Sequence, residues 1–180
     1  MSTHYPAATG DQRTSRHTLC VLVDNEPGVL ARISGMFSGR GYNIESLTVS
    51  ETEHEKHLSR ITICTAGTEA VIEQIKLQLE RLVPVHGVTD LTVNGDAIER
   101  ELALVKVVGQ GDDRVEALRL AGAFGARTLD ATRTSFIFEL TGASEDVDRF
   151  IRLMTEVGLS EVSRTGVAAI GRGAKPMDAR

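Results

Sequence analysis

The sequence predicts an α+β protein made of two ferredoxin-like βαββαβ domains in tandem. Apolar residues alternate with period two in short runs typical of strands, and they recur at helical spacing in longer runs. The same order of elements returns after roughly 80 residues, which indicates an internal repeat. A chain of 180 residues is long enough for two such small domains. Each should form a four-stranded antiparallel sheet with both helices on one face.

The first unit should start with a strand at residues 19–23, which is apolar on both faces. Pro27 suits the first position of the following helix, and Gly41 suits its C-terminal stop. The apolar positions of this helix are Val29, Leu30, Ile33, Met36 and Phe37. Strands are expected around 44–49 and 58–63, then a helix capped by Thr68, and a last strand around 88–93.

The second unit should repeat this order. Its expected elements are a strand at 102–108, a helix from about Asp112, strands at 126–132 and 135–141, a helix capped by Ser144 and ended by Gly158, and a strand at 160–170. The predicted organisation is therefore an N-terminal tail at 1–16, domains at 17–95 and 96–173, and a C-terminal tail at 174–180. One face of each sheet would lack helices, so we expect a dimer at least.

Composition excludes several classes of function. The net charge is −5, aromatic residues make up 4% of the chain, and there is no Trp, so we expect no nucleic-acid partner. The segment LSRITICT (58–65) lacks the aromatic residues that an RNA-recognition module needs on that strand. No apolar run is long enough to span a bilayer and no signal peptide is recognisable, which favours a cytoplasmic location and no membrane partner. Cys20 and Cys64 lie in apolar runs and should be buried free thiols.

The sequence offers no arrangement typical of catalysis or metal binding. His54 and His57 are best explained as part of a solvated hairpin connection (51–57), because such a loop does not fix ligand geometry. The acidic pairs at 112–113 and 145–146 fall in first turns of predicted helices, where the helix dipole favours carboxylates. We therefore expect no catalytic residues, no metal site and no enzymatic activity from this chain by itself.

The turn DNEPG (24–28) is the one stretch that suggests a ligand. It leads into a helix whose first N–H groups lack internal partners and favour an anion. Gly28 leaves room for close approach, while Asn25 and Asn43 add neutral donors and acceptors. Asp24 or Glu26 could meet a cation, so a free amino acid suits this set. An Asx-type turn that caps its own helix is the alternative.

The run GMFSGRGYNIESLTV (35–49), together with the preceding DNEPGVLARIS and the following LSRITI, resembles the small, regulatory subunits of acetolactate synthase (acetohydroxyacid synthase). The segments ELALVKV, FELTG (138–142) and SRTGVAAIGRG (163–173) are similar to the C-terminal domain of the same family. The resemblance covers residues 17–173. It implies that the first domain is an ACT domain.

The resemblance also implies a role. Such a subunit is non-catalytic, activates a catalytic (large) subunit and confers feedback inhibition by branched-chain amino acids, valine foremost. Thiamine diphosphate, Mg²⁺ and FAD are then expected on the catalytic subunit, which condenses pyruvate with pyruvate or 2-oxobutyrate, and no cofactor is expected in this chain. The alternative is a stand-alone ACT-type amino-acid sensor that acts on another partner.

By position, Asn25, Gly28 and Asn43 match the family's valine-contacting residues. Val29 and Leu30 would supply N–H groups at the helix start. In ACT domains of this type two protomers pair side by side with the effector at their interface, so Asn43 and Ile44 would reach the ligand from the neighbouring protomer. The expected effector-binding set is Asn25, Gly28, Val29, Leu30, Asn43 and Ile44.

Overall fold

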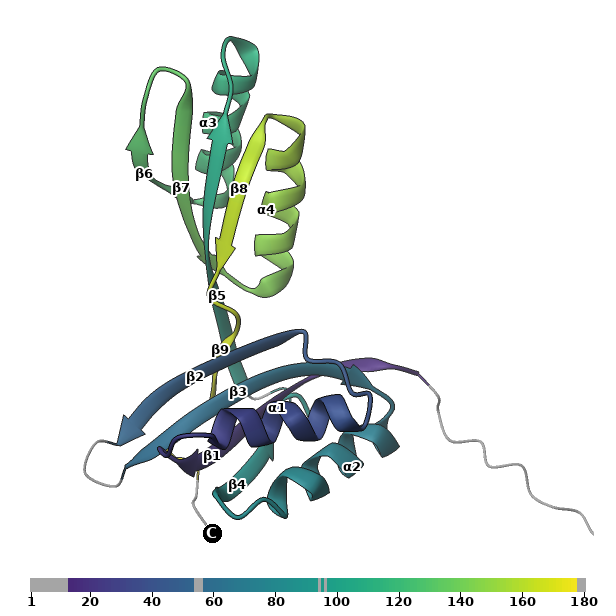
Figure 1. Ribbon diagram of the computed structural model, residues 1–180. Coiled ribbons are helices and arrows are strands. Elements are labelled where there is room, and N and C mark those ends of the chain that lie inside the picture. Colours follow the sequence, from purple (N-terminus) through teal and green to yellow (C-terminus); the bar gives the residue numbers. More distant parts are fainter. Residues whose placement is uncertain (1–12, 54–56, 94, 96, 178–180) are drawn as a thin grey trace, which may run out of the picture.

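The computed structural model describes residues 13–53, 57–93, 95 and 97–177, which form two antiparallel sheets (Figure 1). The first sheet has the order β2-β3-β1-β4. Its elements are β1 (Ser15–Asp24), α1 (Val29–Gly39), β2 (Ser46–Glu53), β3 (Leu58–Gly67), α2 (Glu69–Glu80) and β4 (Val85–Asp90). Both helices cover the same face of the sheet (Figure 1).

The second sheet has the order β6-β7-β5-β8, which repeats the topology of the first. Its elements are β5 (Ala97–Val108), α3 (Asp112–Phe124), β6 (Arg127–Ala131), β7 (Ser135–Gly142), α4 (Ser144–Glu156) and β8 (Leu159–Arg164). A further short strand, β9 (Ala168–Gly171), pairs with β5. The predicted fold class, two βαββαβ units in one α+β chain, is confirmed.

Strand register follows from the apolar alternation. In β1, Leu19 and Val21 lie opposite Ile63 and Ile61 of β3, and all four side chains are buried beneath the helices. A slip by one residue would turn this row to the other face, so the buried row fixes the register. The first core is aliphatic apart from Phe37.

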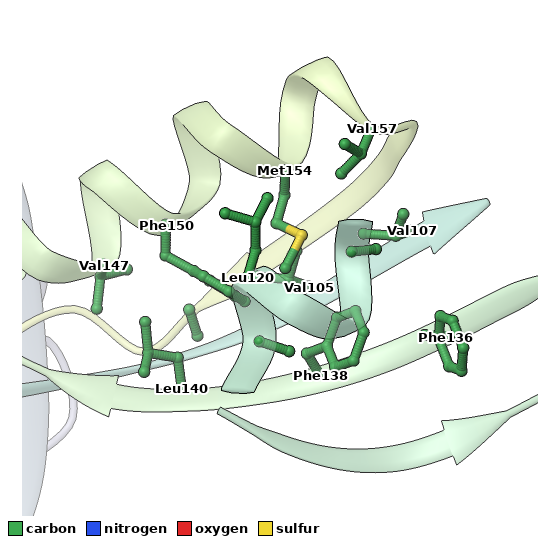
Figure 2. Packing of buried hydrophobic residues seen from close by; sticks show 13 residues of the cluster. Val105, Val107, Leu120, Phe136, Phe138, Leu140, Val147, Phe150, Met154 and Val157 are labelled. Carbon is green, nitrogen blue, oxygen red and sulfur yellow. The ribbon is translucent and has the colours of Figure 1, made fainter. Parts of the chain in front are cut away.

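The second core is more aromatic (Figure 2). Phe138 on β7 and Phe150 on α4 meet edge to face with ring centroids 6.5 Å apart. Gly158, between α4 and β8, has a φ of +98°, and a Cβ there would lie 2.2 Å from the carbonyl oxygen of Val108. Only glycine fits this approach of the turn to β5.

Local helix signals were partly right. The Thr68 hydroxyl accepts a hydrogen bond from the Val71 N–H and caps α2, as predicted. Gly41 has a φ of +71° just beyond α1, also as predicted. Two predictions were wrong by a short shift. Pro27 lies in the turn before α1, because the helix begins at Val29, and Ser144 is the first residue of α4 rather than its cap, which is Ala143.

The expected strand at 160–170 is in fact two strands. β8 ends at Arg164, residues 165–167 leave the second sheet, and β9 pairs with Ala97–Arg100 at the beginning of β5. Val167 and Ala169 pack against Cys64 on the helix-free face of the first sheet. This face is therefore partly covered by the chain itself. From the sequence we expected a second copy of the chain to cover it. The proposed domain limits, 17–95 and 96–173, stay a prediction.

The cysteine prediction is confirmed, since Cys20 and Cys64 are both buried free thiols. Burial raises the pKa of the Cys64 thiol. The hairpin between β2 and β3 includes 54–56, so the prediction for His54 lies outside the described residues. No helix among the described residues is long and apolar enough to cross a membrane.

Candidate functional site

The turn between β1 and α1 is held by backbone hydrogen bonds. The N–H of Asn25 donates to the carbonyl of His57 at 2.7 Å, and the N–H of Glu26 donates to the carbonyl of Asp24 at 3.0 Å. The first of these bonds ties the turn to the start of β3. The turn therefore has a defined position at the end of two paired strands.

Gly28 sets the direction in which α1 leaves this turn. It is the N-cap residue with φ 88° and ψ −6°, in the left-handed region, and its carbonyl accepts from the N–H of Arg32 at 3.0 Å. A side chain at this position would meet no atom within 4 Å, so glycine serves the backbone conformation and keeps the space open.

The beginning of α1 is open to an anion. Among the described residues no side chain caps the helix, and its first turn holds no acidic residue. The N–H of Val29 reaches the carbonyl of Glu26 only at 3.4 Å. Unpartnered N–H groups and the positive end of the helix dipole point out of this end. A carboxylate is the group that such a position binds best.

The six expected effector residues differ in what they can offer. The Val29 side chain belongs to the first core with 5% exposure, so only its backbone can face a ligand. Leu30 is 44% exposed and presents an apolar side chain beside the helix start. The side chains of Asn25 and Asn43 are exposed, whereas Ile44 is half-buried against the first core.

Asp24 is already engaged. Its Oδ1 lies 2.6 Å from Nε2 of His86, at the beginning of β4, so it is a poor candidate for the cation of a ligand. From the sequence, either Asp24 or Glu26 could meet the cation of a ligand, and the contact of Asp24 with His86 was not expected. Nothing in the local pattern could have indicated it, because the two residues are 62 positions apart. Glu26 remains exposed at the turn.

Asn43 and Ile44 lie between α1 and β2. The hydroxyl of Thr65, a fully buried residue of β3, donates to the backbone carbonyl of Asn43 at 2.6 Å. Thr65 therefore fixes the segment that carries Asn43. Sequence reasoning missed this residue, and the available signal was a threonine placed within an apolar strand.

The structure does not bring all six residues together in one chain. Asn25, Gly28, Val29 and Leu30 lie at the beginning of α1, and Asn43 and Ile44 lie beyond its end. The 11 residues of α1 separate the two groups by about 16 Å at 1.5 Å per residue. A single small ligand can touch both groups only if they come from different chains.

The surroundings of this turn were also compared with what a metal site needs. The described residues include no group of three His, Cys, Asp or Glu side chains that could hold a metal ion. The acidic pairs noted in the sequence occupy the first turns of α3 and α4, where we expected them. The open helix end at this turn is chemically suited to an anion.

Comparison with known proteins shows what this chain is similar to. Residues 19–87 match the family model described as "AHAS small subunit-like ACT domain", and residues 100–173 match "Small subunit of acetolactate synthase". The chain is 46% identical to the probable acetolactate synthase small subunit of Archaeoglobus fulgidus over 89% of this chain and 99% of that protein. The chain belongs to the acetolactate synthase small-subunit family.

Other members of the family match at similar length. The acetolactate synthase isozyme 3 small subunit of Escherichia coli is 44% identical over 90% of this chain and 99% of its own. The crystal structure of the acetolactate synthase small subunit from Thermotoga maritima superposes with a TM-score of 0.79 at 37% identity, covering 89% of this chain and 99% of that one. These matches confirm the resemblance inferred from the sequence and place the turn 24–28 in an ACT-type regulatory domain.

Proposed function

We propose that this chain is the non-catalytic regulatory subunit of an acetolactate synthase, and that it activates the catalytic subunit and confers feedback inhibition by valine. The observation that carries the proposal is the beginning of α1, where Gly28 turns an uncapped and acid-free helix end outward within an ACT domain of this family. Control of this kind belongs to the biosynthesis of valine, leucine and isoleucine.

Valine matches the chemistry of the turn. Its carboxylate would accept hydrogen bonds from the N–H groups of residues 28–30, with the helix dipole adding to the attraction. Its ammonium would donate to amide oxygens of Asn25 or Asn43, because Asp24 is engaged by His86. Its isopropyl group would lie against apolar side chains such as Leu30.

A second copy of the chain would complete the site. β2 is an edge strand with no further strand beside it in the described part of the chain, and such an edge invites pairing. α2 packs near β4, and α1 lies toward the β2 side of the sheet (Figure 1). Antiparallel pairing of two β2 strands would place the beginning of one α1 near residues 43–44 of the partner. Exposed Val49 on β2 is available to such a contact.

The holoenzyme would divide its tasks between two kinds of subunit. Thiamine diphosphate, Mg²⁺ and FAD would be held by the catalytic subunit in the cytoplasm, and this chain would bind no cofactor, only valine as its allosteric ligand. Valine can regulate only if it binds two states of the holoenzyme with different affinity. A site shared by two protomers would provide this if the two states differed in how the protomers pair, because pairing and ligand binding would then be linked.

A mixing experiment tests the shared site. The Gly28→Asp and Asn43→Ala variants each damage one half of every site, so each homodimer should bind valine weakly. In a heterodimer purified with two different tags, one site carries both changes and the other carries neither. Calorimetry should then find one normal valine site per heterodimer. A heterodimer without any normal site would contradict the proposal, because a site within one protomer would be damaged in both copies.

A further inference from the structure

The chain contacts β2 where it passes from the second sheet back to the first. We call residues 165–167 the crossover. The N–H of Val167 donates to Oγ of Ser46 at 3.1 Å, and Oγ1 of Thr48 donates to the carbonyl of Thr165 at 3.5 Å. Ser46 and Thr48 are the first and third residues of β2. The crossover therefore lies on the beginning of that strand.

Gly166 makes this contact close. Its φ is +80°, and a Cβ at this position would lie 2.6 Å from Oγ of Ser46 and 3.0 Å from Oγ1 of Thr48. An ordinary Cβ does not lie 2.6 Å from another atom, so a side chain at residue 166 would displace the Ser46 hydroxyl that accepts from Val167. The two hydrogen bonds and this close approach link the position of the crossover to that of β2.

The crossover is equally well anchored in the second domain. The N–H of Thr165 donates to the carbonyl of Leu102 at 3.0 Å, and its hydroxyl accepts from the N–H of Leu102 at 3.1 Å. The preceding Arg164 donates to both carboxylate oxygens of Glu101 at 2.8 and 2.7 Å, and to Asp148 of α4 at 2.6 Å. These bonds pass any movement of the crossover on to β5 and α4.

Charge strengthens this anchor. Glu101 is only 5% exposed. The hydrogen bonds from Arg164 hold the pKa of its carboxyl group below the ordinary value, so Glu101 is ionised at neutral pH. A bidentate pair between arginine and carboxylate also fixes the orientation of both groups. The crossover is therefore attached to a defined point of the second domain.

A cleft of about 590 Å³ lies beside the crossover, between the two domains. Arg16 and Glu45 line it from the first domain, while Ser144 and Asp148 line it from the second. Arg16 and Glu45 form an ion pair of 3.1 Å on their own side of the cleft. The two domains are therefore separated by open space on this side of the crossover.

We propose that Ser46 and Gly166 are positioning residues through which amino-acid binding in the ACT domain moves the second domain. The inference rests on the proposed function, because β2 begins two residues after Ile44 of the proposed effector site. Glu45, the one residue between them, donates its N–H to the carbonyl of Cys64 at 2.9 Å. Ser46 follows residues 43–44 along the chain through Glu45 alone, so a shift of these residues together with the adjoining end of β3 would reach Ser46, and the contact with Gly166 would pass it to the second domain.

The test uses the full-length chain with its matching catalytic subunit. Ser46→Ala removes the acceptor of the Val167 N–H, and Gly166→Ala displaces either the Ser46 hydroxyl or the crossover, so it breaks the same contact. Each variant should bind valine by calorimetry within about twofold of the wild-type affinity and should activate the catalytic subunit normally. The valine concentration for half-inhibition of the holoenzyme should rise at least about fivefold, the lower end of typical allosteric coupling.

Two controls separate coupling from folding. Gly173→Ala imposes the same backbone strain at a φ of +86°, but a Cβ there meets no atom within 4 Å, so inhibition should stay normal. Ser46→Thr keeps the hydroxyl that accepts from Val167, so valine should inhibit the holoenzyme with this variant as it does with the wild type. If Gly166→Ala fails to fold, as judged by its melting temperature, Ser46→Ala alone carries the test.

The possible results are distinguishable. Normal inhibition in the Ser46→Ala and Gly166→Ala variants would overturn this inference and leave the proposed function intact. Loss of valine binding or of activation in these variants would also overturn it, because the contact would then serve the site or assembly rather than coupling. Absence of valine binding in the wild-type chain would overturn the proposed function first, and this inference with it.

Discussion

The helices α1 and α3 occupy the same place in the two βαββαβ units, but their first turns are built differently. Both start behind a glycine with positive φ, Gly28 and Gly111. The first turn of α1 has no acidic residue, whereas that of α3 begins with Asp112 and Asp113. Carboxylates of the chain itself lie in the first turn of α3, so of these two helix ends that of α1 suits an external anion better. The repeated fold thus provides two equivalent helix ends that differ in the charge of their first turns.

The largest effect should come from closing that end of α1. Gly28→Asp places a negative charge where the carboxylate of valine would lie, and it strains a left-handed residue by about 1–2 kcal/mol. Valine binding should be lost while activation of the catalytic subunit survives. Calorimetry and the acetolactate assay check the two parts.

Gly28→Ala is the matched control for strain. A Cβ at position 28 meets no atom within 4 Å, so this variant carries the strain without the charge. It should retain measurable valine binding. If Gly28→Ala lost as much valine affinity as Gly28→Asp, backbone conformation and not charge would explain the effect of Gly28→Asp.

A substitution in the second domain, Glu101→Gln, should lower stability without changing ligand binding. Glu101→Gln removes the charge that Arg164 holds, which should lower the free energy of unfolding by about 1.5–3 kcal/mol at pH 7. Valine binding to the chain should stay within about twofold, the size of a minor perturbation. Chemical denaturation followed by circular dichroism measures the change.

The pH dependence of this difference has a definite sign. Because the pKa of Glu101 is lowered in the folded state, the stabilisation is present above its ordinary value of 4.5 and is lost as the pH falls through the folded value. The gap between wild type and Glu101→Gln should therefore narrow below pH 4.5. A gap that stays constant down to acid unfolding would show that the pair contributes through packing alone.

Asn43→Ala should weaken valine binding by about 1–3 kcal/mol, or about 5- to 150-fold, as expected for a lost polar contact with a charged ligand. Thr65→Val keeps the shape of the buried side chain but removes the hydrogen bond that holds the Asn43 carbonyl. Its effect should have the same direction and be smaller. An unchanged titration for Asn43→Ala would remove this residue from the site.

The smallest effect should come from making α1 resemble α3. Ala31→Glu adds a carboxylate to the first turn of α1, which competes with an anion for the helix end and is worth about 0.3–1 kcal/mol. Valine affinity should fall by about two- to fivefold at low salt and less at high salt. Ala31→Gln is the neutral control and should bind as the wild type does.

Local signals in the sequence predicted much of the fold. Gly41 and Thr68 interact only with residues near them in the sequence, so the local pattern was enough to predict their roles at helix ends. The separation of β9 from β8 could not be predicted in this way, because Val167 and Ala169 are as apolar as a strand of either sheet requires. The partner that decides their position, Cys64, is about a hundred residues away in the chain, and such pairings leave no local signal.

The candidate site shows the same division. The beginning of α1 was predictable from Pro27, Gly28 and the apolar spacing that follows, although the helix begins later than Pro27 suggests. The pairing of Asp24 with His86 and the support of Asn43 by Thr65 depend on neighbouring strands, and they became visible only in three dimensions. The separation of the two halves of the site follows from the length of α1 alone.

The most direct measurement is acetolactate formation by the matching catalytic subunit, with and without this chain, across a titration of valine. We predict that the chain raises the rate and that valine inhibits only when the chain is present. An unchanged rate and no response to valine, with both proteins folded, would contradict the proposed regulatory role. The chain would then be a stand-alone amino-acid sensor, or a small-subunit relative with another partner.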